Sequence, residues 1–239
     1  MSTAPVLYVH GVPNDGELWQ PFVERTGGLR PDLPGFGRAD KPQHFDYSIE
    51  GYARWLRSYV DAESLDRFSL VVHDWGAVAL ALAQDIPERV ERLVILNAVP
   101  LLPGYQWHRV ARLWRTPLAG EMTMGFTYKW GLRRGMPDEL VDHAYSRFDH
   151  GTQRAILKLY RSAPPARLAA AGARLGELKA PALVLWGEHD EYVPASFAQA
   201  YADALGGDAR VETIEGAGHW PWIDRPEVID TVSRFLRGT

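Results

Sequence analysis

The segment FSLVVHDWGAVALALA, residues 68–83, decides the fold. It begins with an apolar run typical of a buried strand, and its small residues from Ala77 to Ala83 predict a helix. A strand that turns sharply into a helix holds the residue at the turn, here Asp74, at the rim of the sheet with its side chain exposed. Gly76 lets the helix pass close by. The segment therefore predicts one strand–turn–helix unit of an α/β protein.

Apolar runs of the same kind occur before and after this unit. We predict further strands at residues 6–9, 90–96, 182–186 and 211–214. Helical spacing of apolar residues predicts helices at residues 18–23, 47–60 and 196–205 and from Pro226 onward. Strands that alternate with helices indicate a mostly parallel sheet with helices on both faces.

Residues 99–176 differ in character from the rest of the chain. Strand-like runs are missing there, and arginine and tryptophan residues at helical spacing dominate. We therefore expect a helical cap over residues 99–176, inserted into a core formed by residues 1–98 and 177–239.

The composition excludes several classes of protein. Of the 239 residues, 46% are hydrophobic and 23% charged, which excludes a disordered or fibrous chain. The lack of cysteine excludes a disulfide framework, a thiolate metal site and a cysteine nucleophile. A net charge of -4 gives no sign of a nucleic-acid partner, and no apolar run approaches the roughly 18 residues of a membrane span. Residues 1–5 lack a basic and apolar leader, so we expect a cytoplasmic protein without a membrane partner.

The carboxylate of Asp74 decides the expected chemistry. A serine at such an elbow attacks carbonyl carbon, whereas a carboxylate attacking there would form an anhydride. A carboxylate is a competent nucleophile at a saturated carbon that carries a leaving group, and the product is an alkyl ester. Water must then attack the carbonyl of that ester, which requires a general base and an oxyanion hole.

Candidates for the base and its partner follow two later predicted strands. Asp190 lies just beyond one of them, and His219 lies in a glycine-rich loop beyond the next. The carboxyl ends of parallel strands meet at one rim of a sheet, so we expect both side chains beside Asp74. The order nucleophile, acid, base is the chain order of the α/β-hydrolase triad. The backbone N–H groups of Val12 and Trp75 are the expected oxyanion donors, and no metal or cofactor is required.

Five short motifs in the expected order make the chain resemble the α/β-hydrolase superfamily over nearly its whole length. These motifs are HGVP at 10–13, DLPGFG at 32–37, VHDWG at 72–76, WGEHD at 186–190 and GAGHWP at 216–221. The Asp-Trp pair at the elbow is similar to that of haloalkane dehalogenases and epoxide hydrolases, which work through an aspartyl ester. The resemblance implies two further strands before the HG motif. Only five residues precede Val6, so we expect a sheet of about six strands.

The resemblance to epoxide hydrolases implies a proton donor in the cap, because ring opening leaves an alkoxide. In that family the donors are cap tyrosines, and Tyr160 is the best match, with 30 residues separating it from Asp190. Tyr128 is the expected second tyrosine, with Tyr105 and Tyr145 as rivals.

The resemblance to haloalkane dehalogenases implies two N–H donors for the halide. The indole of Trp75 supplies one, and Val72 also favours this family, since epoxide hydrolases usually have glycine there. Val12 stands where many dehalogenases have an asparagine donor, so a cap tryptophan would have to serve. The candidates are Trp107, Trp114 and Trp130. Tyr160 has a positional match that the second halide donor lacks, so we favour epoxide hydrolysis. A fluoroacetate dehalogenase is disfavoured, because that family has arginine at the position of Trp75.

We expect the substrate to be a small apolar organic molecule. Nine tryptophans hint at an aromatic cavity, and the residues predicted to bind the substrate are Trp75, His10, Pro13, Trp107 and Trp220. The alternative from another class is a non-catalytic ligand-binding protein on a hydrolase fold. It ranks last, because all three triad candidates are present. The sequence leaves the oligomeric state open.

Overall fold

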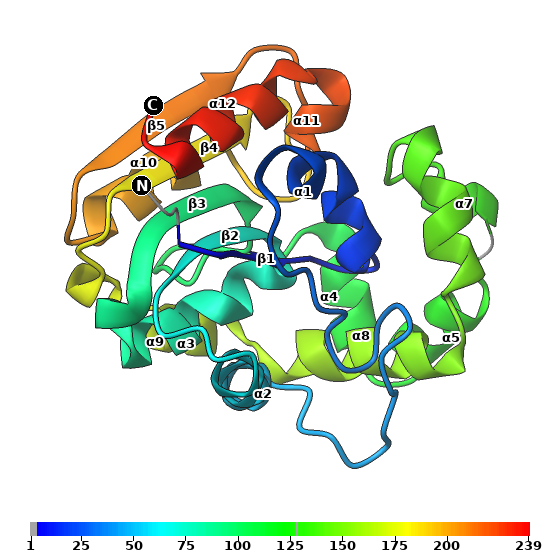
Figure 1. Cartoon of the computed structure of the whole chain (residues 1–239). Coiled ribbons are helices and arrows are strands. Elements are labelled where there is room, and N and C mark those ends of the chain that lie inside the picture. The colour runs from blue at the N-terminus through cyan, green and yellow to red at the C-terminus, as the bar shows by residue number, and fades with distance from the viewer. Residues whose placement is uncertain (1–3, 128) are drawn as a thin grey trace.

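A parallel β-sheet forms the centre of the protein in the computed structural model, which describes residues 4–127 and 129–239 (Figure 1). Within these residues, five strands lie side by side in the order of the sequence. They are β1 (Val6–Val9), β2 (Phe68–Asp74), β3 (Val90–Ala98), β4 (Ala182–Gly187) and β5 (Ala209–Ile214). Every neighbouring pair is parallel.

The described residues contain five strands where the sequence led us to expect about six. The place beside β1 is taken by Leu29 alone, which forms an isolated parallel bridge with Leu7. Gly27 and Gly28 precede it with φ angles of +67° and +118°, outside the extended region. Pro31 follows and has no N–H to donate to a ladder, so the segment is too short and too bent for a strand.

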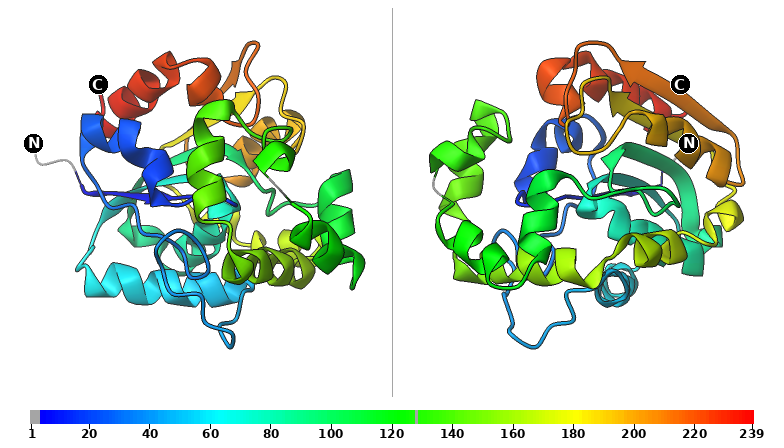
Figure 2. Two further views of the ribbon diagram at one scale, coloured as in Figure 1. Left: turned by 90° about the vertical axis from the view of Figure 1, so that its right-hand side faces the viewer. Right: turned by 180° about the vertical axis from the view of Figure 1, so that it is seen from behind.

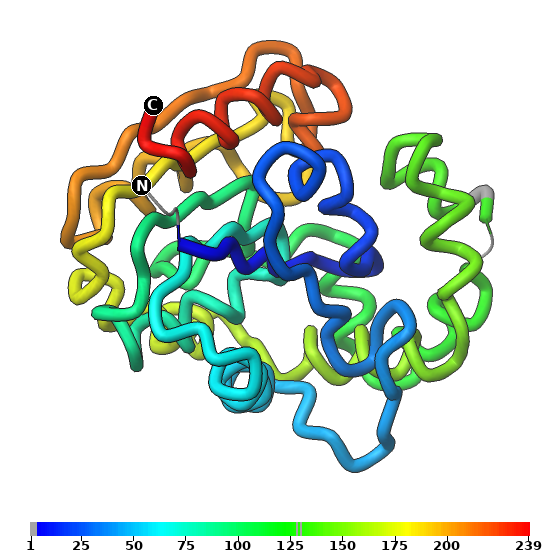
Figure 3. The backbone as a smooth tube through the Cα atoms, in the orientation of Figure 1, coloured from blue at the N-terminus to red at the C-terminus, as the bar shows by residue number. Residues whose placement is uncertain are grey.

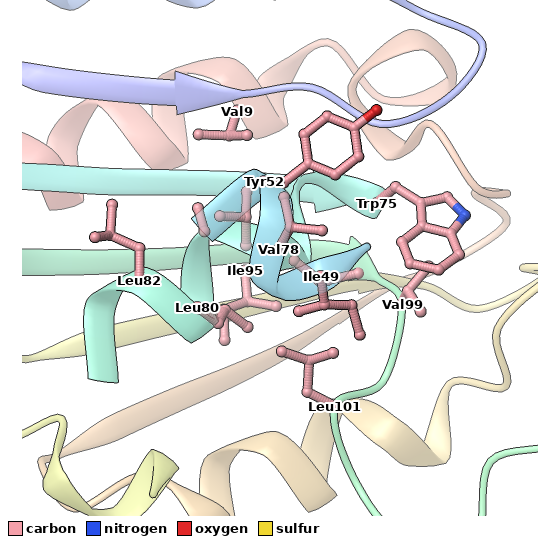
Figure 4. Packing of buried hydrophobic residues seen from close by; sticks show 14 of the residues in the cluster. Val9, Ile49, Tyr52, Trp75, Val78, Leu80, Leu82, Ile95, Val99 and Leu101 are labelled. Carbon is pink, nitrogen blue, oxygen red and sulfur yellow. The ribbon is translucent and has the colours of Figure 1, made fainter. Parts of the chain in front are cut away.

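Alternate residues of each strand point to opposite faces, and two hydrophobic clusters result. On β1, Val6 and Tyr8 belong to the cluster that α1 (Gln20–Thr26) and α12 (Glu227–Arg237) cover. Leu7 and Val9 belong to the cluster on the other face. The helices of that second face are α2 (Ile49–Ala62), α3 (Val78–Asp85) and α10 (Ser196–Ala204). Figure 4 shows part of this cluster, with side chains from β1, α2, α3 and β3 in contact.

The helices that follow β1 lie on opposite faces of the sheet, and this creates a crevice in which a site can form. The chain leaves β1 through the short helix η1 (Gly16–Trp19) and α1 towards Leu29 on the outer side, and then returns through α2 to β2 on the inner side. Crossover connections between parallel strands are right-handed. Two connections that run in opposite directions along the sheet therefore place their helices on opposite faces. The carboxyl ends of β1 and β2 therefore flank the crevice where α/β proteins bind ligands.

The described part of residues 99–176 contains helices and no strand. They are α4 (Arg109–Arg115), α5 (Ala119–Gly125), α6 (Lys129–Leu132), α7 (Asp138–Ser146), α8 (His150–Ser162) and α9 (Pro165–Ala171). Figures 1 and 2 show α4 to α8 beside the sheet, whereas α9 returns to the core near α3. There the side-chain amide of Gln84 donates to the carbonyl of Ala171 at 2.8 Å. The remaining short helices are η2 (Trp75–Ala77), η3 (Pro87–Arg89), η4 (Leu175–Glu177) and α11 (Pro221–Asp224).

A long loop between α1 and α2 fixes the position of α8 (Figure 3). The ammonium group of Lys41 in this loop lies 2.7 Å from the carboxylate of Asp149, the N-cap residue of α8. The hydroxyl of Thr152 donates to the carbonyl of Gly35 at 3.0 Å. The loop thereby holds the helix that carries Tyr160.

Candidate active site

Asp74 lies at a strained turn between β2 and α3. Its φ and ψ angles are 50° and -124°, a region that residues with a side chain rarely adopt. The turn fits because two neighbours lack side chains. A Cβ on Gly76 would lie 2.1 Å from the carbonyl oxygen of Val9, and one on Gly11 would lie 2.2 Å from Oδ1 of Asp74. The elbow thus places a carboxylate in the crevice between β1 and β2.

The structure brings Asp74, Asp190 and His219 together, although 145 residues separate the first from the last. Nδ1 of His219 lies 2.8 Å from Oδ2 of Asp190, and Nε2 lies 3.5 Å from Oδ2 of Asp74. All three side chains are almost fully buried, with exposed fractions of 5%, 0% and 9% for His219, Asp190 and Asp74. The imidazole therefore bridges two carboxylates.

Asp190 is held in place by three further donors. Its Oδ2 accepts from the side-chain amide of Asn97 at 2.7 Å. Its Oδ1 accepts from the backbone N–H groups of Tyr192 at 2.8 Å and Val193 at 3.0 Å. With these bonds and that of His219, the buried carboxylate is fully paired, so it can fix the tautomer and orientation of the imidazole.

The charges of these groups depend on one another. Burial works against the ionised form of Asp74, but the imidazole of His219 and the N–H of Trp75 outweigh it and lower the pKa of Asp74 below its ordinary value. The pKa of Asp190 is likewise lowered, since His219 and Asn97 outweigh burial. Burial alone would lower the pKa of His219, yet the two carboxylates raise it. The site therefore holds two carboxylates and an imidazole that favours its protonated form.

The oxyanion donors predicted from sequence lie around Asp74. The backbone N–H of Val12, in the loop after β1, donates to Oδ1 of Asp74 at 2.8 Å. The loop is in reach because Val9, at the end of β1, pairs with Val72 of β2. The oxygen that faces Val12 is thus distinct from the oxygen that faces His219. Such an arrangement can stabilise negative charge on one oxygen while the other is bonded to carbon.

A cavity of about 540 Å³ opens above the carboxylate and is walled by both the core and the helices after β3. Asp74 and His219 form its polar end. The remaining wall is mostly aromatic and aliphatic, and includes Tyr105, Trp107, Trp114, Tyr160, Tyr192 and Trp220. A cavity of this size with few polar groups suits a small apolar molecule.

The residues predicted to bind substrate fall into two groups. Pro13, Trp107 and Trp220 line the cavity. His10 lies behind its wall, because one ring nitrogen donates to the carbonyl of Gly11 at 2.7 Å and the other accepts from the N–H of Leu33 at 2.9 Å. His10 therefore holds the loop that carries Val12.

Trp75 lies just below the cavity wall, against the buried residues Val78 and Val99 (Figure 4). Its indole stacks on that of Trp107 at 5.3 Å, and the ring of Tyr160 lies perpendicular to it at 5.1 Å. The buried indole nitrogen of Trp75 makes no hydrogen bond of good geometry with the described residues.

The candidate tyrosines occupy different places. Tyr160 and Tyr105 line the cavity. Burial raises the pKa of Tyr160 well above its ordinary value, with Asp74 adding to the effect, so the phenol carries its proton. The hydroxyl of Tyr105 donates to the carbonyl of Tyr192 at 3.4 Å. Tyr145 is 41% exposed and does not line the cavity. Tyr128 and the side chain of Trp130 lie outside the described residues.

Three residues of the site were missed in the sequence. Asn97 is the second-last residue of β3 and has a φ of +41°, and its position at the carboxyl end of a predicted strand was the available signal. Tyr192 and His108 also line the cavity. Tyr192 lies in a loop, and His108 is the residue immediately before α4. Residues that precede a helix or lie in a loop have no periodic pattern, so the direction of their side chains could not be predicted.

His73 supports His219 from the protein interior. One nitrogen of its ring donates to the carbonyl of His219 at 2.8 Å. Burial lowers the pKa of His73 to about 3, aided by the neighbouring His219 and opposed by Asp74, so the ring is neutral.

Within residues 4–127 and 129–239, no three acidic or histidine side chains are grouped as metal ligands would be. In the same residues, no helix combines the length and the hydropathy that crossing a bilayer requires.

A parallel sheet with a carboxylate at the elbow after β2 and helices inserted after β3 defines a class of α/β hydrolases. The family model described as the alpha/beta hydrolase fold matches residues 4–226. The chain belongs to this family.

Similar proteins include enzymes of two kinds. Haloalkane dehalogenase 1 of Mycobacterium tuberculosis is 30% identical over an alignment of 208 positions, which covers 78% of this chain and 68% of that protein. Epoxide hydrolase 3 of Xenopus tropicalis is 25% identical over an alignment of 264 positions, which covers 97% of this chain and 71% of that protein. The crystal structure of haloalkane dehalogenase DbeA from Bradyrhizobium elkani superposes with a TM-score of 0.83 and 26% identity, covering 100% of this chain and 91% of that one. These relatives support a hydrolase of this family.

Proposed function

We propose that the protein is a hydrolase that acts through an alkyl ester of Asp74, and that its substrate is a small apolar epoxide, opened to a vicinal diol. The observation that carries the proposal is the imidazole of His219, placed 3.5 Å from the carboxylate of Asp74 and 2.8 Å from that of Asp190. A carboxylate nucleophile needs such a base only for a second step, the hydrolysis of its own ester.

The first step forms the ester. Oδ2 of Asp74 attacks a ring carbon of the epoxide, and a carbon–oxygen bond of the ring breaks with its electron pair passing to the oxygen. That oxygen takes the phenolic proton of Tyr160, whose ring lies in the same cavity wall. The ester has no negative charge at Asp74, so one of the two carboxylates that raise the pKa of His219 is lost. The imidazole then gives up its proton, which restores the phenol of Tyr160, and can act as a base.

The second step releases the diol. His219 removes a proton from water, and the hydroxide adds to the carbonyl carbon of the ester. The charge develops on Oδ1, which the N–H of Val12 contacts at 2.8 Å. The bond between that carbon and Oδ2 breaks, and Oδ2 leaves in the diol with a proton from the imidazolium. The new carboxyl group then passes its remaining proton to the imidazole, and the carboxylate returns.

A haloalkane dehalogenase is the second candidate, and a specific observation favours it. The buried indole N–H of Trp75 makes no hydrogen bond of good geometry among the described residues, and its contact with the phenol of Tyr160 only partly offsets the effect of burial on the pKa of that phenol. An N–H so weakly paired is expected of a donor that awaits a halide. A halide needs no proton, so Tyr160 would be dispensable. We place epoxide opening first because the phenol of Tyr160 lies in the same wall as Asp74.

Product analysis separates the two activities. The expected result is diol from styrene oxide, with little chloride from 1-chlorobutane or bromide from 1-bromobutane. Halide release without diol would reassign the protein to the dehalogenases. Neither product with a panel of either substrate class would favour the third alternative, a non-catalytic ligand-binding protein.

The replacement Tyr160→Phe is predicted to reduce epoxide opening by roughly 100-fold or more, since a positioned general acid contributes on this scale. Any release of halide should stay within about threefold, because the halide leaves without a proton. Rates of diol and halide formation measure both. Tyr145→Phe removes a hydroxyl from a tyrosine that is 41% exposed and serves as the control. Epoxide opening that survives in Tyr160→Phe would rule out the phenol as the acid.

The replacement Gly11→Ala is predicted to displace the nucleophile. Its methyl group would lie 2.2 Å from Oδ1 of Asp74, so the carboxylate must leave the N–H of Val12. A displacement of about 1 Å costs roughly 100-fold in rate, and overpacking costs about 1–3 kcal/mol of stability. Turnover and thermal unfolding of the variant measure the two effects. Gly125→Ala, where nothing lies within 4 Å of the added Cβ, should change neither.

We further propose that residues 99–176 act as a cap that selects the substrate. The cavity wall beyond Asp74 and His219 comes mainly from this segment, including Trp107, Trp114 and Tyr160. Its aromatic character supports a small apolar organic substrate.

A further inference from the structure

His108 is a polar group in the cavity wall to which the steps above give no role. It lies immediately before α4 and lines the same cavity as Asp74. Its ring centre is 6.5 Å from that of Tyr160, in a perpendicular arrangement, and 5.0 Å from that of Tyr192. The ring of Tyr192 is in turn 5.0 Å from that of His219. His108 therefore shares the cavity wall with Tyr160, and the ring of Tyr192 connects it to the imidazole of the candidate triad.

The hydrogen bonding of His108 determines which nitrogen carries the proton. Nδ1 faces the backbone N–H of Ala111 at 3.4 Å and caps the first turn of α4 as an acceptor. The proton of the neutral ring is then on Nε2. Burial lowers the pKa of His108 to about 4, although Asp74 acts in the opposite direction. Near neutral pH, His108 is thus an uncharged N–H donor, and the only side-chain hydrogen bond that the described residues give it is the one at Nδ1.

Several other polar groups of the cavity wall are already engaged. The hydroxyl of Tyr105 donates to the carbonyl of Tyr192 at 3.4 Å, and that of Tyr192 donates to the carbonyl of Gly135 at 2.5 Å. The indole N–H of Trp107 donates to the carbonyl of Ala163 at 2.9 Å. Each of these donors would have to break a bond within the protein in order to contact a ligand, whereas Nε2 of His108 would not.

We propose that His108 is the second cap donor to the leaving oxygen of the substrate. This inference rests on the proposed function. As the bond from Oδ2 of Asp74 to carbon forms and the ring carbon–oxygen bond breaks, the electron pair develops on the oxygen. Tyr160 transfers its proton to that oxygen, and His108 keeps its own proton and stabilises the oxygen through a hydrogen bond from Nε2. One donor moves a proton and the other holds the oxygen in place.

Two replacements separate this role from that of a helix cap. His108→Asn keeps a favourable N-cap side chain at the position of Nδ1 but removes the donor at the position of Nε2. His108→Gln does the reverse, because its amide nitrogen reaches about as far as Nε2 but is poorly placed to cap. The rate of ester formation on Asp74 under single-turnover conditions, measured in a His219→Gln background, reports on the step concerned. Trp114→Phe removes a cavity-lining indole and serves as the comparison.

The expected result is a roughly 100-fold slower ester formation in His108→Asn, the scale on which the loss of one oxyanion donor acts. His108→Gln should stay within about threefold of the parent, and the melting temperature of His108→Asn should not change. A parent-like rate in His108→Asn, an equal loss in both replacements, or a loss found only in Trp114→Phe would overturn the role of His108. Absence of any ester in the parent would instead refute the aspartyl mechanism, and the role of His108 with it.

Discussion

Replacing Asp74 with asparagine is expected to abolish turnover, with a loss of roughly 10⁴-fold or more, as removal of a covalent nucleophile produces. The amide oxygen carries no charge and attacks saturated carbon poorly. The fold should remain, because an amide oxygen can still accept from the N–H of Val12, which lies 2.8 Å from Oδ1. Burying a neutral group in place of a charged one also removes a desolvation cost.

Rates of product formation and intact-protein mass spectrometry test this expectation together. Asp74→Asn should form no product and gain no mass on incubation with substrate. Asp66→Asn, which changes an exposed carboxylate before β2, is the matched control and should behave as the parent does. A variant at Asp74 that still turns over at a tenth of the parent rate would show that another group attacks the substrate.

The strands could be predicted from short apolar runs in the sequence. The three polar side chains could be predicted because each lies at or just beyond the end of such a run. Buried parallel strands are continuous apolar runs, and the predicted run at 182–186 matches β4 (Ala182–Gly187) to one residue. Parallel strands also bring their carboxyl ends to one rim. Asp74, Asp190 and His219 were therefore expected to meet. In the structure, the two ring nitrogens of His219 lie 3.5 Å from the carboxylate of Asp74 and 2.8 Å from that of Asp190.

The missing sixth strand shows how local chemistry overrides a resemblance. The segment around Leu29 has the position of a strand beside β1, and one bridge to Leu7 remains. The two glycines before it adopt positive φ angles, and prolines at positions 31 and 34 follow within five residues. These residues disfavour an extended ladder.

Residues 99–176 could be predicted as helical, but the position of their helices could not be predicted. That position depends on contacts between residues more than 100 apart in sequence, such as Lys41 with Asp149 and Asp15 with His143, each pair 2.7 Å apart. No periodic pattern encodes such pairs. For that reason the sequence identified Tyr160 through a resemblance but gave no role to His108.

Replacing His219 with glutamine is expected to stop turnover at the ester, with a loss of roughly 10³-fold or more in the steady state. Ester formation should continue, because Asp74 remains and its other oxygen still faces Val12. Mass spectrometry of the peptide that contains Asp74 measures the adduct. An epoxide adds its whole mass, whereas a haloalkane adds its alkyl group without the halogen, so the adduct also identifies the substrate class. His189→Gln changes an exposed neighbour and should accumulate no ester.

The same intermediate should appear in the unmodified protein at acidic pH. Asp190 still raises the pKa of His219 after Asp74 has become an ester, so lowering the pH protonates the imidazole and removes the base. The pKa of Asp74 is lowered, so its carboxylate stays ionised and ester formation continues. A reaction run at about pH 5 and quenched rapidly should therefore contain more ester than one run at about pH 8. A peptide that stays unmodified in His219→Gln with every epoxide and haloalkane offered would contradict the covalent mechanism. Ester that accumulates equally at both pH values would contradict the assignment of His219 as the base.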